Sequence, residues 1–416
     1  DPARRLSNRP QRTGAAFRVS TSIHRAQYID AVAERWSKLA DSLYALPNWL
    51  RTAESRDGGG RHYAVLDGED GPRGGLVAYH MTGKSWFYNN PVAHLLRPDP
   101  AMKTFLTPAE RQQLAALAWE LAKVGERLHP ALVSVLPSGY LPGLLRAPGA
   151  GDGVMEELAD ELERTRADRG LETAAVMHVP EQDTAVRDVL QRRGYVPFVS
   201  VGDCVLTTSW PDFDGYLASL RSPRPTRIRR EIRGFEESGA SLRETTIDAM
   251  NDQHGELHCA QLRRYGHDVH LEGSLALIES IQSNPTGRGR VLEAWREDVL
   301  VGFVVFYELN REFHPKMIGV GAQERTAFIY FNLCYYGLIR IAVSEGVRSI
   351  VYGPESYEAK VFRGCDLEKR ISHLRVPEDL RDTVSATAAA LDAGNRRRLD
   401  SFAWQDRAGA ACRTHE

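Results

Sequence analysis

Three side chains in the last third of the sequence have the types that acid–base and charge-stabilising chemistry requires. Glu355 directly follows Gly353-Pro354 and is a candidate general base. Lys360 is a candidate for binding a phosphate or for stabilising the charge that develops on a carbonyl oxygen. Tyr336 is a candidate for protonating a leaving group. The alternatives are an exposed loop carboxylate, a surface ion pair and a packed aromatic ring, respectively.

A short basic cluster occupies the middle of the sequence and consists of Arg227, Arg229, Arg230 and Arg233. Arginines grouped in this way can clamp a phosphate. The alternative is an exposed helix face, because Arg227 and Glu231 form an i,i+4 pair of opposite charge. Since the cluster is short, we expect no sequence-specific binding of DNA.

The composition limits the possible classes of protein. The 416 residues contain 53 lysines and arginines against 55 aspartates and glutamates, so the formal net charge is −2 and no global basic field exists for bulk nucleic acid. No run of about 18 apolar residues predicts a membrane span, and the N-terminal residues contain no apolar signal segment. The 5 cysteines form no CxxC pair, which argues against a zinc site or a disulfide framework. We expect a cytoplasmic protein of two domains.

The second half has a pattern that predicts the element order β-α-α-β-β-β-α-β-α-β. A basic helix at 225–238 precedes it. We expect the strands at 240–246, 290–295, 300–309, 313–320, 349–352 and 371–376, and the helices at 250–265, 274–282, 327–345 and 357–362. The turn at 296–298 is short enough for a hairpin, so the strands beside it should be antiparallel neighbours. The helix at 327–345 is apolar nearly all round and should be buried between layers.

The first half has a less regular pattern. We expect strands at 17–21, 62–67, 75–81, 131–136 and 174–179, and helices at 27–39, 108–128 and 154–167. A last extended stretch ends near Trp210, and Pro211 marks the predicted domain boundary.

The ends of the two halves match each other. In the first half a helix stops at Gly170, a strand reaches Pro180, another helix follows, and Gly194 turns the chain into a strand. The same order in the second half uses Gly346, Pro354 and Gly364. Two copies of one unit explain this order, although helix–Gly–strand is also common in unrelated α/β proteins. We predict a flexible tail at 1–16, domains at 17–210 and 211–393, and a tail at 394–416.

The predicted element order resembles the GNAT acyltransferase fold, and two such halves in one chain resemble the Fem family. Residues 213–220, with the basic stretch 227–233 and residues 236–239, are similar to the family's "fddYLasL…R…iRRE…eeaG" segment. Residues 331–336 resemble its "HFExCYY" helix, and residues 358–364 resemble its "EHKxxRG" stretch. The likeness covers roughly residues 17–380. It implies an α/β protein with mixed sheets and tandem GNAT-like domains.

The sequence departs from the family at several positions. Tyr330 and Asn332 stand where the family has His and Glu, and Ala359 replaces the His of "EHK". The acid–base roles of those family positions therefore do not transfer. A non-catalytic, duplicated binding module is the alternative that these departures favour.

The acyl donor is constrained by the stretch 319–326. Common acetyl-CoA-dependent members of the fold hold pyrophosphate on an Arg/Gln-x-x-Gly-x-Gly/Ala turn at a helix N-terminus. This stretch lacks that spacing and contains Glu324, so an acetyl-CoA-dependent acetyltransferase is the less favoured alternative. The resemblance favours a donor carried by aminoacyl-tRNA or by the phosphopantetheine of an acyl or peptidyl carrier protein. We expect no tightly bound cofactor and no metal.

The resemblance also suggests binding residues. In GNAT folds a backbone bulge on the third meander strand binds the donor carbonyl, and Pro315 beside Lys316 suits a bulge or a plain strand edge. The predicted donor-binding residues are Arg227, Arg229, Arg230, Lys316, Arg325 and Arg363. The predicted acceptor-binding residues are Trp86, Tyr88, Tyr330, Asn332 and His373. For Trp86 and Tyr88 the alternative is an aromatic strand packed against the core.

Together these features predict an N-acyltransferase that forms an amide between an activated acyl or aminoacyl group and a small-molecule amine. Because of the departures from the family pattern, we expect natural-product or peptide-type biosynthesis, such as that of an antibiotic, rather than cell-wall cross-bridge synthesis.

Overall fold

The computed structural model describes residues 22–55, 60–151, 153–322 and 327–407. The strands of the first half are β1 (Ser22–Ala26), β2 (Arg61–Gly68), β3 (Gly71–Met81), β4 (Ala131–Ser134), β5 (Leu144–Arg146), β6 (Thr173–Pro180) and β7 (Val196–Thr207). Those of the second half are β8 (Ala240–Thr246), β9 (Arg288–Arg296), β10 (Val299–Leu309), β11 (Glu312–Val320), β12 (Ser349–Gly353) and β13 (Asp366–Arg375). The predicted strand at 17–21 lies outside the described residues.

The helices of the first half are α1 (Ala33–Ser37), α2 (Pro47–Glu54), α3 (Pro91–Leu96), α4 (Pro100–Lys103), α5 (Pro108–Lys123), α6 (Gly125–Leu128), α7 (Gly153–Asp168) and α8 (Thr184–Arg192). Those of the second half are α9 (Phe213–Ser219), α10 (Arg224–Glu237), α11 (Asp252–Arg264), α12 (Leu271–Ser283), α13 (Ile329–Phe331), α14 (Leu338–Ser344), α15 (Tyr357–Phe362) and α16 (Arg381–Arg407).

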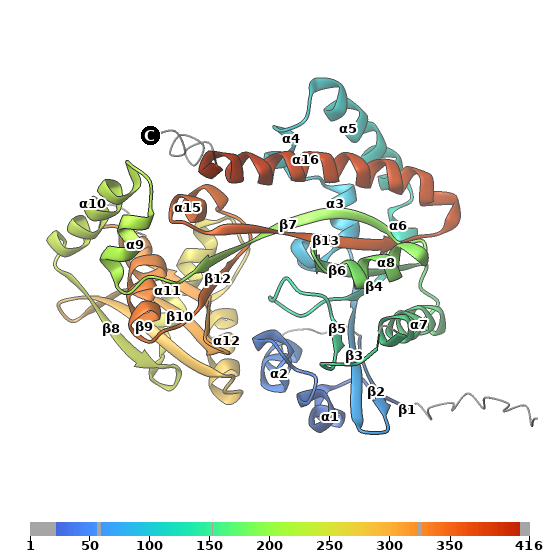
Figure 1. The fold of residues 1–416 in the computed structure, drawn as a ribbon, viewed down its shortest axis with the longest axis horizontal. Helices are drawn as coiled ribbons and strands as arrows, with labels where there is room; N and C mark the ends of the chain where they lie inside the picture. Colours follow the sequence, from blue (N-terminus) through green and yellow to red (C-terminus); the bar gives the residue numbers. More distant parts are fainter. Residues whose placement is uncertain (1–21, 56–59, 152, 323–326, 408–416) are drawn as a thin grey trace, which may run out of the picture.

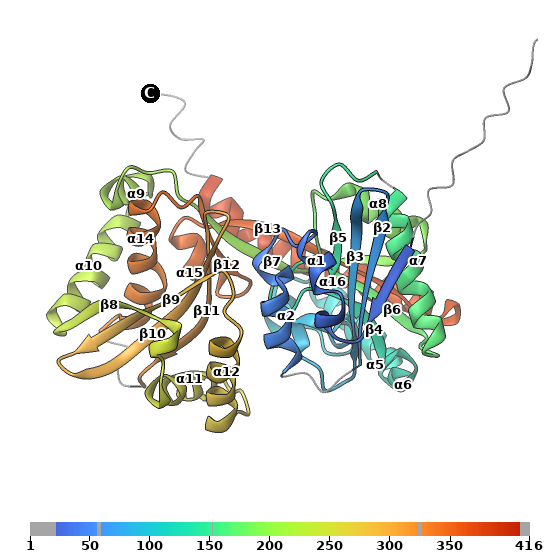
Figure 2. The same ribbon diagram turned by 90° about the horizontal axis from the view of Figure 1, so that it is seen from below.

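A single mixed sheet continues through both halves. Its strand order is β1-β2-β3-β4-β6-β13-β7-β12-β11-β10-β9-β8, with β5 paired to β3 at one side. Figures 1 and 2 show the two halves side by side, joined by the long strands β7 and β13. The hairpin expected around residues 296–298 is confirmed, because β9 and β10 are antiparallel neighbours.

The last strands of the two halves are exchanged. β7 ends the first half but pairs with β12 of the second, and β13 ends the second half but pairs with β6 of the first. The two exchanged strands also pair with each other, from Asp366 opposite Val205 to Leu374 opposite Val196. Since each half completes the sheet of the other, the division of the chain at residue 211 remains a prediction.

The internal repeat is visible in the strand pairing. The pairs β4–β6 and β11–β12 are both parallel and occupy equivalent places on the two sides of the exchanged strands. Each repeat also ends its long helix on a left-handed glycine, since φ is 64° at both Gly170 and Gly346. Glycine has no Cβ to clash in that conformation. The structure thus confirms that the chain contains two copies of one α/β unit.

Helices cover both faces of the sheet. One face of the first half packs against α7, and one face of the second half packs against the layer that contains α14. On the opposite side, apolar residues of α2, α12, β3 and β10 form one cluster that crosses from one half to the other. The two halves therefore share a core as well as a sheet.

The predicted buried helix at 327–345 is present but not uniform. It begins as α13, continues as a π-helical segment from Asn332 to Gly337, and ends as α14. Every residue of the π segment is buried. A π segment widens a helix locally, and such segments are frequent at functional sites.

The predicted C-terminal tail is wrong over much of its length. Residues 394–407 belong to α16, which lies across β7 and contacts α5 and α15 (Figure 1). Leu399 is buried and faces Gly202 of β7. The Asn395 amide donates a hydrogen bond to the Val199 carbonyl at 2.7 Å. α16 is thus part of the fold because it covers the exchanged strands.

Replacing Leu399 by Ala should therefore destabilise the protein. The substitution removes buried apolar surface and leaves a cavity over β7, so we expect the free energy of unfolding to fall by about 2–4 kcal/mol in chemical denaturation. The matched control is Val299→Ala, at a side chain that is 63% exposed, which should change stability little. Equal stabilities for the two variants would show that α16 does not contribute to the core.

Candidate functional site

The strands β11 and β12 separate soon after they begin to pair. Their parallel ladder contains only Glu312 with Ser349 and Phe313 with Ile350. Beyond these pairs β11 is bonded to β10 alone, while β12 is bonded to β7. The sheet therefore opens between β11 and β12.

A β-bulge on β11 lies at this opening. Val305 of β10 pairs with Met317 and Phe306 pairs with Pro315, so Lys316 is the extra residue. A proline lacks the N–H that a regular ladder needs, and its presence fits the irregularity. Of the two interpretations of Pro315, a bulge or a plain strand edge, the structure shows the bulge, which places Lys316 at the opening.

A loop of the first half approaches the bulge. The Lys316 Nζ atom donates a hydrogen bond to the Ser138 carbonyl at 3.0 Å and lies 4.4 Å from the centre of the Tyr44 ring. Ser138 and Tyr140 both have positive φ, at 58° and 50°. Residues other than glycine hold that conformation only where the surroundings enforce it, and such residues cluster at functional sites.

A cavity of about 250 Å³ lies between the halves at Lys316. Its lining is largely apolar and includes Trp49 from α2, Ile281 from α12 and Tyr307 from β10. Burial in these surroundings disfavours the charged ammonium and lowers the pKa of Lys316 to about 8. An amine that titrates near neutral pH in a hollow between two domains is suited to proton transfer.

Lys360 is buried and holds the end of β12. Its Nζ atom donates hydrogen bonds to the carbonyl oxygens of Tyr352, Gly353 and Pro354, at 3.1, 2.9 and 2.7 Å. An ammonium has three N–H donors, and these contacts use all of them. The geometry gives Lys360 a positioning function at the opening of the sheet, in place of the predicted direct contact with substrate.

Glu355 lies between the halves, in an ion-pair network. Its carboxylate is 3.2 Å from Arg398 of α16, and Arg398 also contacts Asp99 at 2.6 Å. Burial, and after it the charge of Glu355, raises the pKa of the Tyr88 phenol. The structure therefore brings the predicted acceptor residue Tyr88 near Glu355, although these residues are far apart in the sequence.

Trp86 is 54% exposed, and its ring lies 5.5 Å from the ring of His267 in the second half. It therefore lies at the rim between the halves.

Several predicted site residues surround the buried carboxylate of Glu231, a residue that the sequence analysis did not select for the site. The Arg363 guanidinium donates to it at 2.7 Å, and the Tyr336 hydroxyl donates to the same oxygen atom. Arg227 donates to its other oxygen at 3.1 Å, and the Asn332 amide donates to the Glu231 backbone carbonyl at 3.2 Å. This closed network joins α10, the π segment and the C-terminal end of α15, so the structure gives Tyr336, Arg363 and Asn332 a packing function.

The remaining predicted residues are dispersed. Arg229 and Arg230 are exposed on α10, which packs on the sheet face opposite the cavity at Lys316. Tyr330 packs against Phe331, with ring centres 5.5 Å apart. His373 is fully buried in β13, and burial lowers its pKa to about 3. Arg325 lies outside the described residues.

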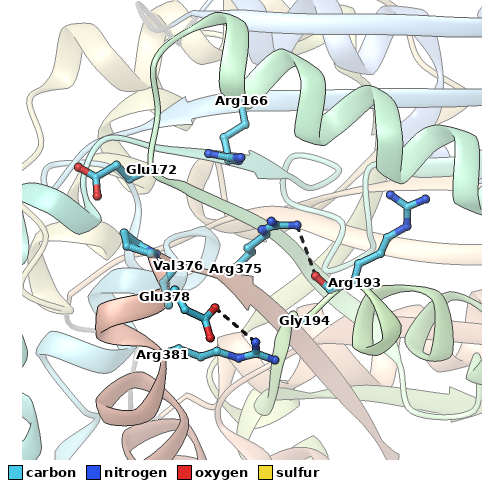
Figure 3. Close-up of a pocket in the computed structure, with 9 residues that line it drawn as sticks. Arg166, Glu172, Arg193, Gly194, Arg375, Val376, Glu378 and Arg381 are labelled. Atoms are coloured by element: carbon cyan, nitrogen blue, oxygen red, sulfur yellow. Dashed lines mark hydrogen bonds and ion pairs between the residues drawn. The ribbon is translucent and has the colours of Figure 1, made fainter.

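A separate hollow of about 270 Å³ lies at the far end of β13 and is shown in Figure 3. Arg375 donates to the Arg193 carbonyl at 3.4 Å, and Arg381 pairs with Glu378 at 3.5 Å. Four arginines line the hollow, and the other two also have partners, since Arg166 lies 3.0 Å from Glu163 and Arg193 lies 2.8 Å from Glu156. No predicted site residue lines it.

Among the described residues, no group of three or more His, Cys, Asp or Glu side chains is arranged to hold a metal ion. No helix in the described part of the chain is long and apolar enough to cross a membrane.

The chain matches a family model and several solved structures. The FemAB-like family, described as peptidoglycan biosynthesis/recognition, matches residues 115–402. The structure of FemX is similar with a TM-score of 0.55 and 8% identity, over 87% of this chain and 100% of that one. No curated protein matches the sequence.

Two further structures are similar at lower scores. The C-terminal domain of a putative lysylphosphatidylglycerol synthetase from Agrobacterium fabrum has a TM-score of 0.49 and 11% identity, over 87% of this chain and 95% of that one. A tandem GNAT protein from the clavulanic acid biosynthesis pathway has a TM-score of 0.46 and 12% identity, over 86% and 98%. The family match covers more than half of the sequence, and FemX shares the predicted tandem GNAT-like fold. The chain therefore belongs to the FemAB-like family and is an acyl- or aminoacyltransferase.

Proposed function

We propose that the protein forms an amide bond between an activated acyl or aminoacyl group and an amine, in the opening between β11 and β12. The observation that carries the proposal is the half-buried Lys316 on the β-bulge, at a cavity between the two halves. The bulge presents backbone at the separated strands, and the largely apolar cavity can hold the reacting groups close together.

In the proposed reaction the amine nitrogen attacks the donor carbonyl, the new C–N bond forms, and the C–O or C–S bond to the carrier breaks. The amine loses one proton, and the departing hydroxyl or thiol gains one. Lys316 in its neutral form accepts the proton from the attacking amine, because a general base is most effective when its pKa lies near the working pH.

The donor is proposed to be held by its carrier, either an RNA or a carrier-protein phosphopantetheine. Arg229 and Arg230 are exposed on α10, on the sheet face opposite the cavity, so they can contact phosphates only of a carrier large enough to extend around the sheet, as an RNA is. The amine is proposed to enter at the rim formed by Trp86 and Tyr88. The amide is proposed to belong to natural-product or peptide-type biosynthesis. The alternative is peptidoglycan biosynthesis, which the description of the family names.

Two substitutions of Lys316 separate a base from a simple positive charge. Lys316→Met removes the amine, whereas Lys316→Arg keeps the charge but cannot accept a proton near neutral pH. We expect both to lower the rate of amide formation about 100-fold or more, measured by mass spectrometry in single turnovers with an aminoacylated RNA and an amine. The control is Lys123→Met, an exposed lysine of α5, which should keep the wild-type rate. Full activity of Lys316→Arg would contradict the base function.

The proposed base also predicts a pH profile. Because burial favours the neutral amine, the fraction of deprotonated Lys316 increases as the pH rises through about 8. The single-turnover rate should rise with pH and level off above about 8, and Lys316→Arg should lose this inflection. A profile that is the same in both proteins would assign the titration to another group.

Salt dependence distinguishes the two carriers. If the carrier is an RNA held through about three phosphate contacts, its affinity should fall about 100-fold between roughly 50 and 400 mM salt. Replacing Arg229 and Arg230 together by Ala should weaken RNA binding about tenfold, whereas Arg111→Ala on the exposed face of α5 should not. An affinity that does not change with salt would exclude the RNA carrier and favour the carrier protein.

A further inference from the structure

A second cavity, of about 200 Å³, lies between the halves next to the one at Lys316. Its floor is the face of β7, β11, β12 and β13, and its cover is formed by residues 41–44 and the loop at 139–141. Tyr44 lines this second cavity and contacts a residue that lines the first, since Lys316 lies over its ring; the Tyr44 hydroxyl is 3.1 Å from Nδ1 of His314. None of the residues predicted from the sequence lines this second cavity.

The centre of this cavity is a buried ion pair whose hydrogen-bonding capacity is only partly used. Arg370 of β13 donates to the Oδ2 atom of Asp203 of β7 at 2.6 Å, and the two residues are 5% and 2% exposed. The Asp203 Oδ1 atom and the Arg370 Nε atom are both buried without a hydrogen-bond partner. A buried polar atom without a partner is costly, so the pair as it stands favours a ligand that offers one donor and one acceptor.

The charge of the lining selects the kind of donor. Four carboxylates line the cavity, those of Asp41, Asp203, Glu312 and Glu368, against a single arginine. Burial lowers the pKa of His314 to about 3, so its ring adds no positive charge near neutral pH. An excess of negative charge in a partly enclosed hollow attracts cations. The same excess disfavours anions, because the single arginine is already paired with a carboxylate.

We propose that this cavity binds a primary ammonium group, with Asp203 as its acceptor and with Arg370 donating to a carbonyl oxygen of the same ligand. The cavity volume suits a small amine of the size of an amino-acid amide. The inference concerns binding alone and does not depend on the reaction proposed above. It assigns a function to two residues that come from the exchanged strands of different halves.

Two amides of the same size and shape test the proposal. Alaninamide carries an ammonium group beside a carbonyl, and lactamide has a hydroxyl in place of the ammonium. With the full chain, saturation-transfer NMR should detect binding of alaninamide. Lactamide should bind with an affinity lower by a factor of about ten or more. Equal binding of the two amides, or no saturation transfer to alaninamide, would overturn the proposal.

Variants locate the site. Replacing Asp203 by Asn and Arg370 by Gln together keeps a neutral hydrogen-bonding pair, so the fold is not left with one unpaired buried charge. This double variant should lower alaninamide affinity about tenfold or more.

Glu368→Gln, at the half-exposed carboxylate 3.1 Å from Arg370, provides a milder test and should lower the affinity about threefold. Glu378→Gln, at an exposed carboxylate in another part of the chain, is the control and should bind as the wild type does. Unchanged affinity in the first two variants would place the ammonium elsewhere.

Discussion

The antiparallel ladder between β7 and β13 is the pairing on which the rest of the structure depends. Each of these strands comes at the end of one repeat and is built into the sheet of the other. Because each repeat supplies the strand that completes the sheet of the other repeat, the exchange ties the two repeats into one unit. The shared apolar cluster and α16 then cover the strands that the exchange brings together.

The two cavities follow from this arrangement. The separation of β11 from β12 opens the sheet at Lys316, and the loop of the first half that carries Ser138 limits the opening from the other side. Asp203 and Arg370 meet because β7 and β13 are neighbours. Neither cavity could be formed by a single repeat, which gives a physical reason for both copies to be present in one chain.

Local sequence patterns predicted much of the fold. The strand at 240–246 and the helix at 357–362 have the expected limits, since alternation and turn residues are local signals. The helix α16 was missed although Val384, Ala388, Leu391 and Leu399 repeat at helical spacing and are buried. Residues 392–398 of α16 are mostly small residues and arginines. That composition is typical of an exposed tail as well as of a helix.

The site was less predictable than the fold. The bulge at Lys316 has a local cause in Pro315, and the sequence therefore indicated it. The burial of Glu231 has no local signal, because only the packing of three separate elements makes its carboxylate the centre of a network. The Asp203–Arg370 pair depends on the strand exchange, and no pattern within either half indicates it.

The exchanged strands also determine when the protein can finish folding during synthesis. The edge of β6 that receives β13 stays unpaired until the ribosome has made the chain beyond Arg375. An exposed strand edge of this kind can pair with other chains. The nascent first half therefore exposes this strand edge until β13 has been made.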